Sequence, residues 1–243
     1  KAVFPAERYH SGVTLERIEQ DDLGVSAHFV GGDRMCGDLL VGADGLRSTV
    51  RGHVLAEVKP FYPGYVAWRC LTDETALSAR THELLFNRYA LCAARGEQGI
   101  GYPVPGLDHS VEPGRRQYNV VWYHPVREAD ELPRMLTDDQ GRTHAGGIPP
   151  ALLSIRVRDE MVALARKTLA PVFAEAVECA HLHFFQPIVD LESPRLVVGR
   201  VALIGDAAFV ARPHVAMGVP KAGGDALALV RALDRSGDDY RAG

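Results

Sequence analysis

Two short apolar runs, one near each end of the chain, are each followed directly by a turn built from an Asp and a Gly. After the first run, 38–43, apolar residues recur at four-residue spacing, which predicts a strand, a tight turn and a short helix. After the second run, 201–204, a loop leads to a predicted helix over about 219–233. Strands joined to helices in this way form open α/β sheets, in which ligands bind beyond the carboxyl ends of the strands.

The middle of the chain has a different composition from its two ends. From Pro60 to about Pro187 the chain is richer in aromatic residues, whereas both flanks share the short-strand pattern. We therefore predict one domain over 1–56 and 187–243, with a second domain, 57–186, inserted into it. Further strands are expected at 13–18, 25–30, 99–104, 117–123 and 196–198, and further helices at 158–169 and 171–179.

The overall composition excludes several classes of protein. Hydrophobic residues make up 47% and charged residues 24% of the 243 residues, and no apolar stretch is long enough for a transmembrane helix. The net charge of −4 gives no electrostatic reason to expect nucleic acid or an anionic membrane as a partner. The cysteines lie far apart in the sequence, so no metal site is predicted, and a reduced, cytoplasmic setting is the default.

The first Asp-Gly turn has the features of an anion-binding site. Gly42 and Gly45 allow the backbone to approach a ligand closely, and the N-terminus of the helix that follows offers free N–H groups. An Asp-Gly pair also occurs in hairpin turns. The helical spacing after Asp44 argues against that alternative, because a hairpin needs a second strand.

The second turn places a carboxylate, that of Asp206, at the tip of a buried strand. There it can accept hydrogen bonds from two neighbouring hydroxyls of a sugar or polyol. Pro213 stiffens the approach to the last helix, and glycines from Gly218 onward leave room for a flat ring. The structural alternative is a strand, a capping Asp and a packed helix.

Taken together, these two motifs resemble those of the class A flavoprotein aromatic hydroxylases, which have the p-hydroxybenzoate hydroxylase fold. Asp44-Gly45 matches the D-G motif of that family and Gly205-Asp206 its G-D motif, and the resemblance covers nearly the whole chain. It implies an α/β (α+β) fold: an FAD-binding Rossmann-like domain, incomplete at its N-terminus, with an inserted β-sheet substrate domain.

A narrower resemblance is carried by three segments, 62–69, 102–106 and 212–214. They are similar to the 2,6-dihydroxypyridine 3-hydroxylase branch and the nearby hydroxynicotinate hydroxylases. A complete member of the family opens with a strand, a G-x-G-x-x-G turn and a helix that hold the FAD pyrophosphate. The 243 residues contain no such turn in that context. We therefore expect an N-terminally truncated fragment that holds FAD poorly.

The resemblance also implies a reaction and a set of cofactor residues. The reaction is hydroxylation of an electron-rich hydroxypyridine or phenolic ring through a flavin C4a-hydroperoxide, with FAD as cofactor and NADH or NADPH and O₂ as co-substrates. The start of the last helix is expected to stabilise the anionic reduced flavin. The implied cofactor-binding residues are Asp44, Gly45, Gly205, Asp206, Pro213, Met217, Gly218 and Val219.

Two residues are candidates for contact with the substrate ring. His214 is the candidate catalytic base, because the pKa of a histidine lies near working pH, and its alternative role is to cap the loop. Tyr102 is the candidate hydrogen-bond partner of the ring, or else an aromatic of the sheet with a satisfied hydroxyl. Arg47 and Arg51 are expected to be solvated helix residues, with attraction of nicotinamide phosphates as the alternative.

Two other classes of function stay open at this point. One is a noncatalytic remnant that keeps the substrate domain and half of the flavin site. The other is a flavin-dependent reductase on the same fold without oxygen chemistry. The expected partners are a small aromatic or pyridine substrate and O₂, with no nucleic acid and no membrane, and a homodimer is kept open.

Overall fold

The computed structural model describes residues 4–236 of the chain, which form two compact units. Unit 1 combines Lys1–Phe61 with Val189–Gly243, and unit 2 is Tyr62–Ile188. Unit 2 is thus an insertion in unit 1. The sequence-based division set the insertion at 57–186. Each unit is described by itself below.

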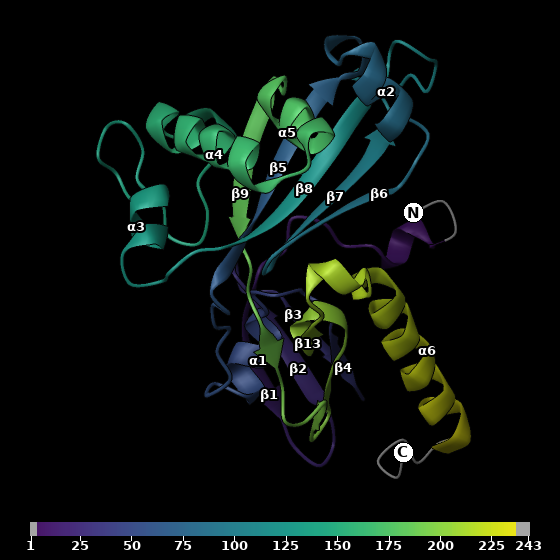
Figure 1. The fold of residues 1–243 in the computed structure, drawn as a ribbon. Coiled ribbons are helices and arrows are strands. Elements are labelled where there is room, and N and C mark those ends of the chain that lie inside the picture. The colour runs from purple at the N-terminus through teal and green to yellow at the C-terminus, as the bar shows by residue number, and fades with distance from the viewer. Residues whose placement is uncertain (1–3, 237–243) are drawn as a thin grey trace. The chain divides into compact units, whose positions relative to one another are not determined.

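Unit 1 is built from small sheets and two α-helices within the described residues (Figure 1). Its strands are β1 (Leu15–Gln20), β2 (Val25–Phe29), β3 (Arg34–Gly37), β4 (Leu40–Gly42), β10 (Leu191–Glu192), β11 (Val197–Val198), β12 (Val201–Leu203) and β13 (Phe209–Val210). Its helices are α1 (Thr49–Val54) and α6 (Gly218–Ser236), with 3₁₀ turns at Ala6–Arg8, Gly205–Ala207 and Pro213–Val215. The sheets have the orders β1-β2-β3, β11-β12-β4 and β10-β13.

The sheet that matters for the site pairs two strands from opposite ends of the chain. β12 and β4 run parallel, with Leu203 opposite Gly42. The sheet packs on α1 so closely that a Cβ on Gly42 would lie 2.7 Å from Val50 Cγ1 and 2.8 Å from Leu203 Cδ2. Glycine at this position therefore lets α1 lie directly on the ends of both strands.

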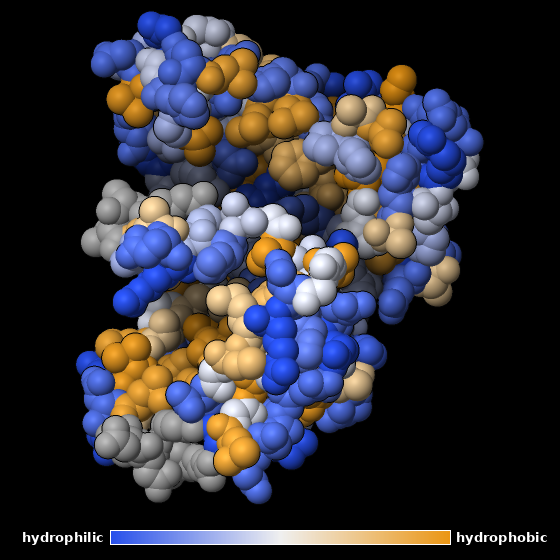
Figure 2. Space-filling view, turned by 180° about the vertical axis from the view of Figure 1, so that it is seen from behind, coloured by the Kyte–Doolittle hydropathy of each residue, from blue (hydrophilic) through white to orange (hydrophobic). Residues whose placement is uncertain are grey.

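Helix α6 carries an apolar surface that the described residues leave uncovered. Val219, Leu227 and Val230 are all exposed, Val219 at 86% of its surface. Figure 2 shows hydrophobic residues gathered over this part of unit 1. Along the same helix Ala222, Ala226 and Leu229 are half-buried. None of the described helices is long and apolar enough to cross a bilayer.

Unit 2 is a five-stranded antiparallel sheet covered by helices (Figure 1). Its strands are β5 (Tyr65–Asp73), β6 (Ala90–Ala94), β7 (Glu97–Val104), β8 (Gln117–Pro125) and β9 (Leu182–Pro187), in the order β6-β7-β8-β5-β9. Its helices are α2 (Ala79–Leu85), α3 (Glu131–Met135), α4 (Ile155–Thr168) and α5 (Pro171–Glu178), with 3₁₀ turns at Glu74–Ala76 and Pro150–Leu152.

The two faces of this sheet have different neighbours. The main core of unit 2 joins Trp68 and Trp122 on one face to residues of all four helices, such as Leu85, Met161 and Phe173. Strand periodicity sends Trp122 and Tyr123 to opposite faces. The other face carries a smaller cluster, Ala67, Ile100, Val121, Tyr123 and Ile188, with Tyr65 and Tyr102 beside it. None of the helices of unit 2 packs on that second face.

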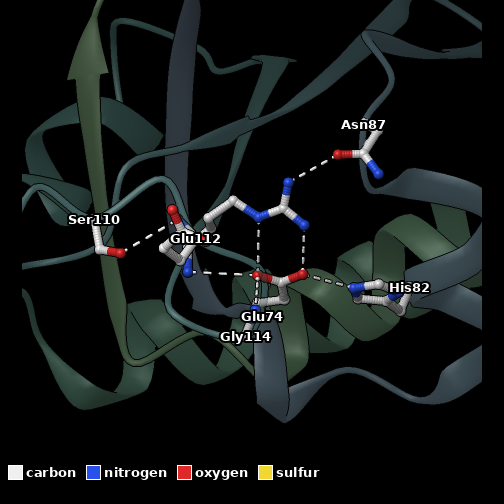
Figure 3. Close-up of polar contacts among 7 residues, drawn as sticks. Glu74, His82, Asn87, Ser110, Glu112 and Gly114 are labelled. Carbon is white, nitrogen blue, oxygen red and sulfur yellow. Dashed lines mark hydrogen bonds and ion pairs between the residues drawn. The ribbon is translucent and has the colours of Figure 1, made fainter.

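A buried carboxylate fixes the end of β5 to two other segments (Figure 3). Glu74 accepts hydrogen bonds from Arg116 Nε at 3.0 Å and Nη2 at 2.6 Å, from His82 Nε2 at 2.7 Å and from Gly114 N at 2.7 Å. Arg116 also donates to Asn87 Oδ1 at 2.8 Å. The network connects the loop before β8 to α2 and stabilises the end of the sheet at which β5 ends.

The fold class predicted from the sequence, α/β (α+β), is confirmed: both units mix helices and sheets, and unit 2 is mainly sheet. The predicted strands 13–18, 25–30, 99–104 and 117–123 correspond to β1, β2, β7 and β8. The predicted helices 158–169 and 171–179 correspond to α4 and α5. Strands β3, β5, β6, β10 and β13 had no counterpart in the sequence-based prediction.

Candidate functional site

The two Asp/Gly motifs lie side by side in unit 1. Because β4 and β12 are parallel neighbours, the turns that follow them leave the same edge of the sheet. Ile204 N donates to Gly42 O at 3.0 Å, which keeps the two strands paired up to the turns. Gly45 and Gly205 have φ angles of 78° and 59°, a conformation that favours glycine.

Asp44 serves the turn itself. Its carboxylate accepts hydrogen bonds from Ser48 Oγ at 2.5 Å and from Val50 N at 3.1 Å. Ser48 in turn accepts from Arg51 N at 2.9 Å as the N-cap of α1. The side chain of Asp44 therefore organises the start of α1, as capping carboxylates do.

Arg51 links the two motifs and is buried, with 4% of its surface exposed. It donates from Nη1 to Ala207 O at 2.9 Å and from Nη2 to Leu46 O at 2.6 Å. The expectation of a solvated helix residue is therefore wrong for Arg51, because both turns present carbonyl groups to its guanidinium. Arg47 is exposed, as expected.

Asp206 differs from Asp44, whose carboxylate accepts hydrogen bonds within its own turn. Its side chain is exposed and makes no hydrogen bond or ion pair with any residue in the range 4–236. The expected capping alternative is not seen, since the 3₁₀ turn Gly205–Ala207 that contains Asp206 has no side-chain cap. The carboxylate is thus exposed to solvent at the carboxyl end of β12.

The turn after β12 is fastened to α6 by two residues that the sequence analysis did not single out. Gly205 N donates to Asp225 Oδ2 at 2.8 Å, and Lys221 Nζ donates to Gly205 O at 2.9 Å. Lys221 and Asp225 also form an ion pair at 2.6 Å. Their i, i+4 spacing on a helix was the available signal. These contacts of Lys221 and Asp225 fix the position of the Gly205-Asp206 turn relative to the N-terminal half of α6.

A pocket of about 480 Å³ opens beside this turn, within unit 1. Its walls are mostly apolar, with His214 and Lys221 among the polar residues. That size and lining are typical of a site for a small molecule or cofactor. Phe61, Leu191, Phe209, Val215 and Met217 supply the apolar part of the lining.

The segment between β13 and α6 carries the remaining predicted residues. Arg212 forms a two-pronged ion pair with Asp190, at 2.5 to 3.1 Å. Pro213 begins the short turn that holds His214, whose side chain is exposed at the pocket. Ala216 follows with a left-handed φ of 53°, and Gly218 begins α6.

Met217, the last residue before α6, lines the pocket, whereas Val219, in the first turn of α6, does not. Met217 is 48% exposed, whereas Val219 is 86% exposed on the first turn of α6. Structure and sequence thus agree on Met217 and Gly218 as the entrance to α6.

Tyr102 lies in unit 2, on the sheet face that no helix of that unit covers. Its ring stacks on that of Tyr89, with centroids 5.8 Å apart and planes 7° from parallel. It is half-buried next to the Ile100 and Tyr123 cluster. The predicted catalytic pair is therefore divided between the units, His214 in unit 1 and Tyr102 in unit 2.

The site combines parallel strands that end in glycine turns, an exposed carboxylate and an adjoining apolar pocket. These features are typical of α/β proteins that bind a nucleotide cofactor. The family model for FAD binding domain-like proteins matches residues 62–190, more than half of the chain. The chain therefore belongs to the FAD binding domain-like family.

Comparisons with individual relatives also relate the chain to FAD-dependent enzymes. The chain is 30% identical to 2,6-dihydroxypyridine 3-monooxygenase of Paenarthrobacter nicotinovorans over 97% of this chain and 58% of the relative. It is 24% identical to 6-hydroxynicotinate 3-monooxygenase of Bordetella bronchiseptica over 97% of this chain and 54% of the relative. The solved structure of 2,6-dihydroxypyridine-3-hydroxylase from Arthrobacter nicotinovorans matches with a TM-score of 0.85 and 29% identity, over 100% of this chain and 60% of that one.

These matches confirm the predicted resemblance to the class A flavoprotein hydroxylases and to the dihydroxypyridine branch. The chain spans less than two thirds of the length of each of these relatives. Conclusions about the activity of a whole protein are therefore drawn as proposals.

Proposed function

We propose that the protein containing this chain is an FAD-dependent monooxygenase that hydroxylates an electron-rich hydroxypyridine or phenolic ring, with NADH or NADPH and O₂ as co-substrates. The observation that carries the proposal is the meeting of the two motifs at one sheet edge, beside an apolar pocket. The relatives named above, which act on hydroxypyridine rings by name, support the substrate class.

The residues present fit the flavin and ribityl part of FAD. Asp206 offers an exposed carboxylate for polyol hydroxyls, and the pocket offers an apolar wall for a flat ring. The N-terminal end of α6, which begins at Gly218, favours negative charge on a bound ring. When bound and reduced, FAD supplies the activation of O₂. The chain's part is to bind, to orient and to exclude water.

His214 is proposed to accept the ring hydroxyl proton. Its position on the pocket wall gives it access to a bound ligand, and histidine is the side chain best suited to proton transfer near neutral pH. Tyr102 is proposed to hydrogen-bond the ring from the substrate-binding unit. Lys221 and Asp225 are proposed to act as positioning residues for the Gly205-Asp206 turn.

The test uses the full-length protein that contains this chain, loaded with FAD. Hydroxypyridines and phenols are supplied in air with NADH or NADPH, and hydroxylated product is quantified by mass spectrometry alongside hydrogen peroxide. We expect His214→Ala to lower the rate of hydroxylation by about 10²–10⁴-fold with little change in FAD affinity. His10→Ala, which replaces an exposed histidine outside the pocket, is the matched control.

Two outcomes would contradict the proposal in different ways. Hydroxylation at the wild-type rate by His214→Ala would remove His214 from the mechanism and leave the monooxygenase assignment intact. Consumption of NADH or NADPH without any hydroxylated product would instead support the reductase alternative.

A further inference from the structure

Arg69 lies on an interior strand of the unit 2 sheet and has no hydrogen-bond or ion-pair partner among residues 4–236. It lies on β5, an interior strand, opposite Val121 of β8 and Phe184 of β9. Alternation along β5 places its side chain on the face that carries Tyr65 and Ala67, which is the face that no helix of unit 2 covers. The residue is half-buried.

The other arginines that are not exposed all have acceptors. Arg51 and Arg200 each donate to backbone carbonyl groups, and Arg116 donates to the carboxylate of Glu74. Arg69 makes no hydrogen bond or ion pair with any residue between 4 and 236. Guanidinium groups carry five donors and are costly to bury without a partner, so this arrangement is unusual within the chain.

No carboxylate of the sheet is placed to serve Arg69. Its same-face neighbours by strand register include Leu71, Asn119, Val121, Phe184 and Gln186, none of which is acidic. The nearest acidic residue on that face of β5 is Asp73, which already accepts a hydrogen bond from Gln117 at 3.0 Å. A negative partner for Arg69 therefore has to come from outside the sheet.

Two tyrosines, Tyr65 and Tyr123, lie on the same face of the sheet as Arg69. Tyr123 is its diagonal neighbour, and the rings of Tyr65 and Tyr123 meet edge to face with centroids 6.2 Å apart. Burial raises the pKa of the Tyr123 hydroxyl, and the nearby positive charge of Arg69 opposes that shift. The face thus combines flat apolar contact surface with one uncompensated positive charge.

We propose that Arg69 binds an oxyanion carried by the aromatic substrate, either a ring carboxylate or an ionised ring hydroxyl, and so selects anionic rings over neutral ones. The inference rests on the proposed function, since it names the substrate class of that site. Charge complementarity carries it, because an anionic ring satisfies the guanidinium and the aromatic face together. Arg69 is a specificity residue that contacts substrate and takes no part in the proton transfer.

The experiment measures binding directly, without turnover. Full-length protein loaded with FAD is titrated by calorimetry with three probes: 6-hydroxynicotinate, its neutral amide 6-hydroxynicotinamide, and 2,6-dihydroxypyridine. We expect Arg69→Gln to raise the Kd of an anionic probe about 10- to 100-fold and that of the neutral amide by less than about threefold. Arg69→Lys is expected to recover part of the loss, and Arg80→Gln, at an exposed arginine of α2, serves as the control.

The probes separate the two sources of the anion. A loss confined to 6-hydroxynicotinate identifies a carboxylate as the partner, and a loss confined to 2,6-dihydroxypyridine identifies an ionised ring hydroxyl. Because Arg69 has no partner in the sheet, Arg69→Gln is expected to keep the wild-type melting temperature.

Equal effects of Arg69→Gln on the anionic and neutral probes, or no discrimination between them by the wild-type protein, would overturn the inference. In that case product formation from any ring would still uphold the monooxygenase assignment. Conversely, charge-selective binding without any product would uphold the role of Arg69 in binding and contradict the proposed reaction.

Discussion

Asp206 presents a carboxylate that no described residue hydrogen-bonds, so its removal costs the folded chain little. We expect Asp206→Ala in the FAD-loaded full-length protein to weaken FAD binding by about 10- to 100-fold, because charged hydrogen bonds contribute about 1.5–3 kcal/mol. The melting temperature of the apoprotein should stay within about 2 °C of wild type. Fluorescence titration with FAD and thermal unfolding measure the two quantities, and Asp33→Ala, at an exposed turn, is the control. A large loss of melting temperature with unchanged FAD affinity would make Asp206 structural.

In contrast to Asp206, Glu74 has a buried carboxylate that accepts hydrogen bonds from Arg116, His82 and Gly114. Hydrogen bonding from Arg116, and secondarily from His82, holds the pKa of Glu74 at about 2, below its ordinary value of 4.5. A lowered pKa stabilises the fold above pH 4.5, and this contribution disappears as the pH falls toward 2. We expect Glu74→Gln to lower the free energy of unfolding by about 3 kcal/mol at pH 7 and by much less near pH 2–3.

Urea unfolding of the 243-residue chain at several pH values checks this dependence on Glu74. Glu112→Gln replaces a neighbouring exposed carboxylate and should change the stability little at any pH. A stability loss for Glu74→Gln that stays constant with pH would show that packing, and not the charge, is what the substitution removes.

At the scale of secondary-structure elements, the contact between α1 and the β4–β12 pair depends on the missing side chain of Gly42. Gly42→Ala places a Cβ within 3 Å of Val50 and Leu203, so we expect a loss of about 1–3 kcal/mol in unfolding free energy. Gly52→Ala, within α1 and with open space around it, should instead raise stability by about 0.5–1 kcal/mol. Thermal unfolding of both variants is the measurement. Equal effects of the two substitutions would contradict this account of the packing.

The sequence predicted those elements whose pattern is local. Residues 46–54 have helical spacing and contain α1, and the alternation at 25–30 marks β2. Strand β5 was missed because both of its faces are largely buried, so apolar residues run through it without alternation. The Gly205 turn was recognised from its residues. Its attachment to Lys221 and Asp225 was not, because that contact depends on where α6 packs.

At the scale of the whole molecule, the 243 residues include the exposed carboxylate of Asp206, proposed above to bind FAD, and no G-x-G-x-x-G turn. We expect the 243-residue chain to bind FAD weakly, because contacts to the pyrophosphate and adenosine supply several kcal/mol and each 1.4 kcal/mol changes affinity tenfold. Gel filtration with excess FAD, followed by an absorbance spectrum, tests this. A yellow protein with stoichiometric FAD would contradict the prediction. The full-length protein, treated alike, is the comparison.

The pairing of β4 with β12 also sets an order of events during synthesis on the ribosome. Leu203 meets Gly42 only after the whole of unit 2 has been made, so the sheet of unit 1 cannot close while unit 2 is still emerging. The neighbouring antiparallel strands of unit 2 lie closer in sequence and can pair earlier. Once unit 2 has folded, the pairing of β5 with β9 holds its two ends, Tyr62 and Ile188, close together. The conformational entropy lost in closing this long loop has then been lost before β4 and β12 pair. Folding of unit 2 first would therefore lower the entropic cost of pairing β4 with β12.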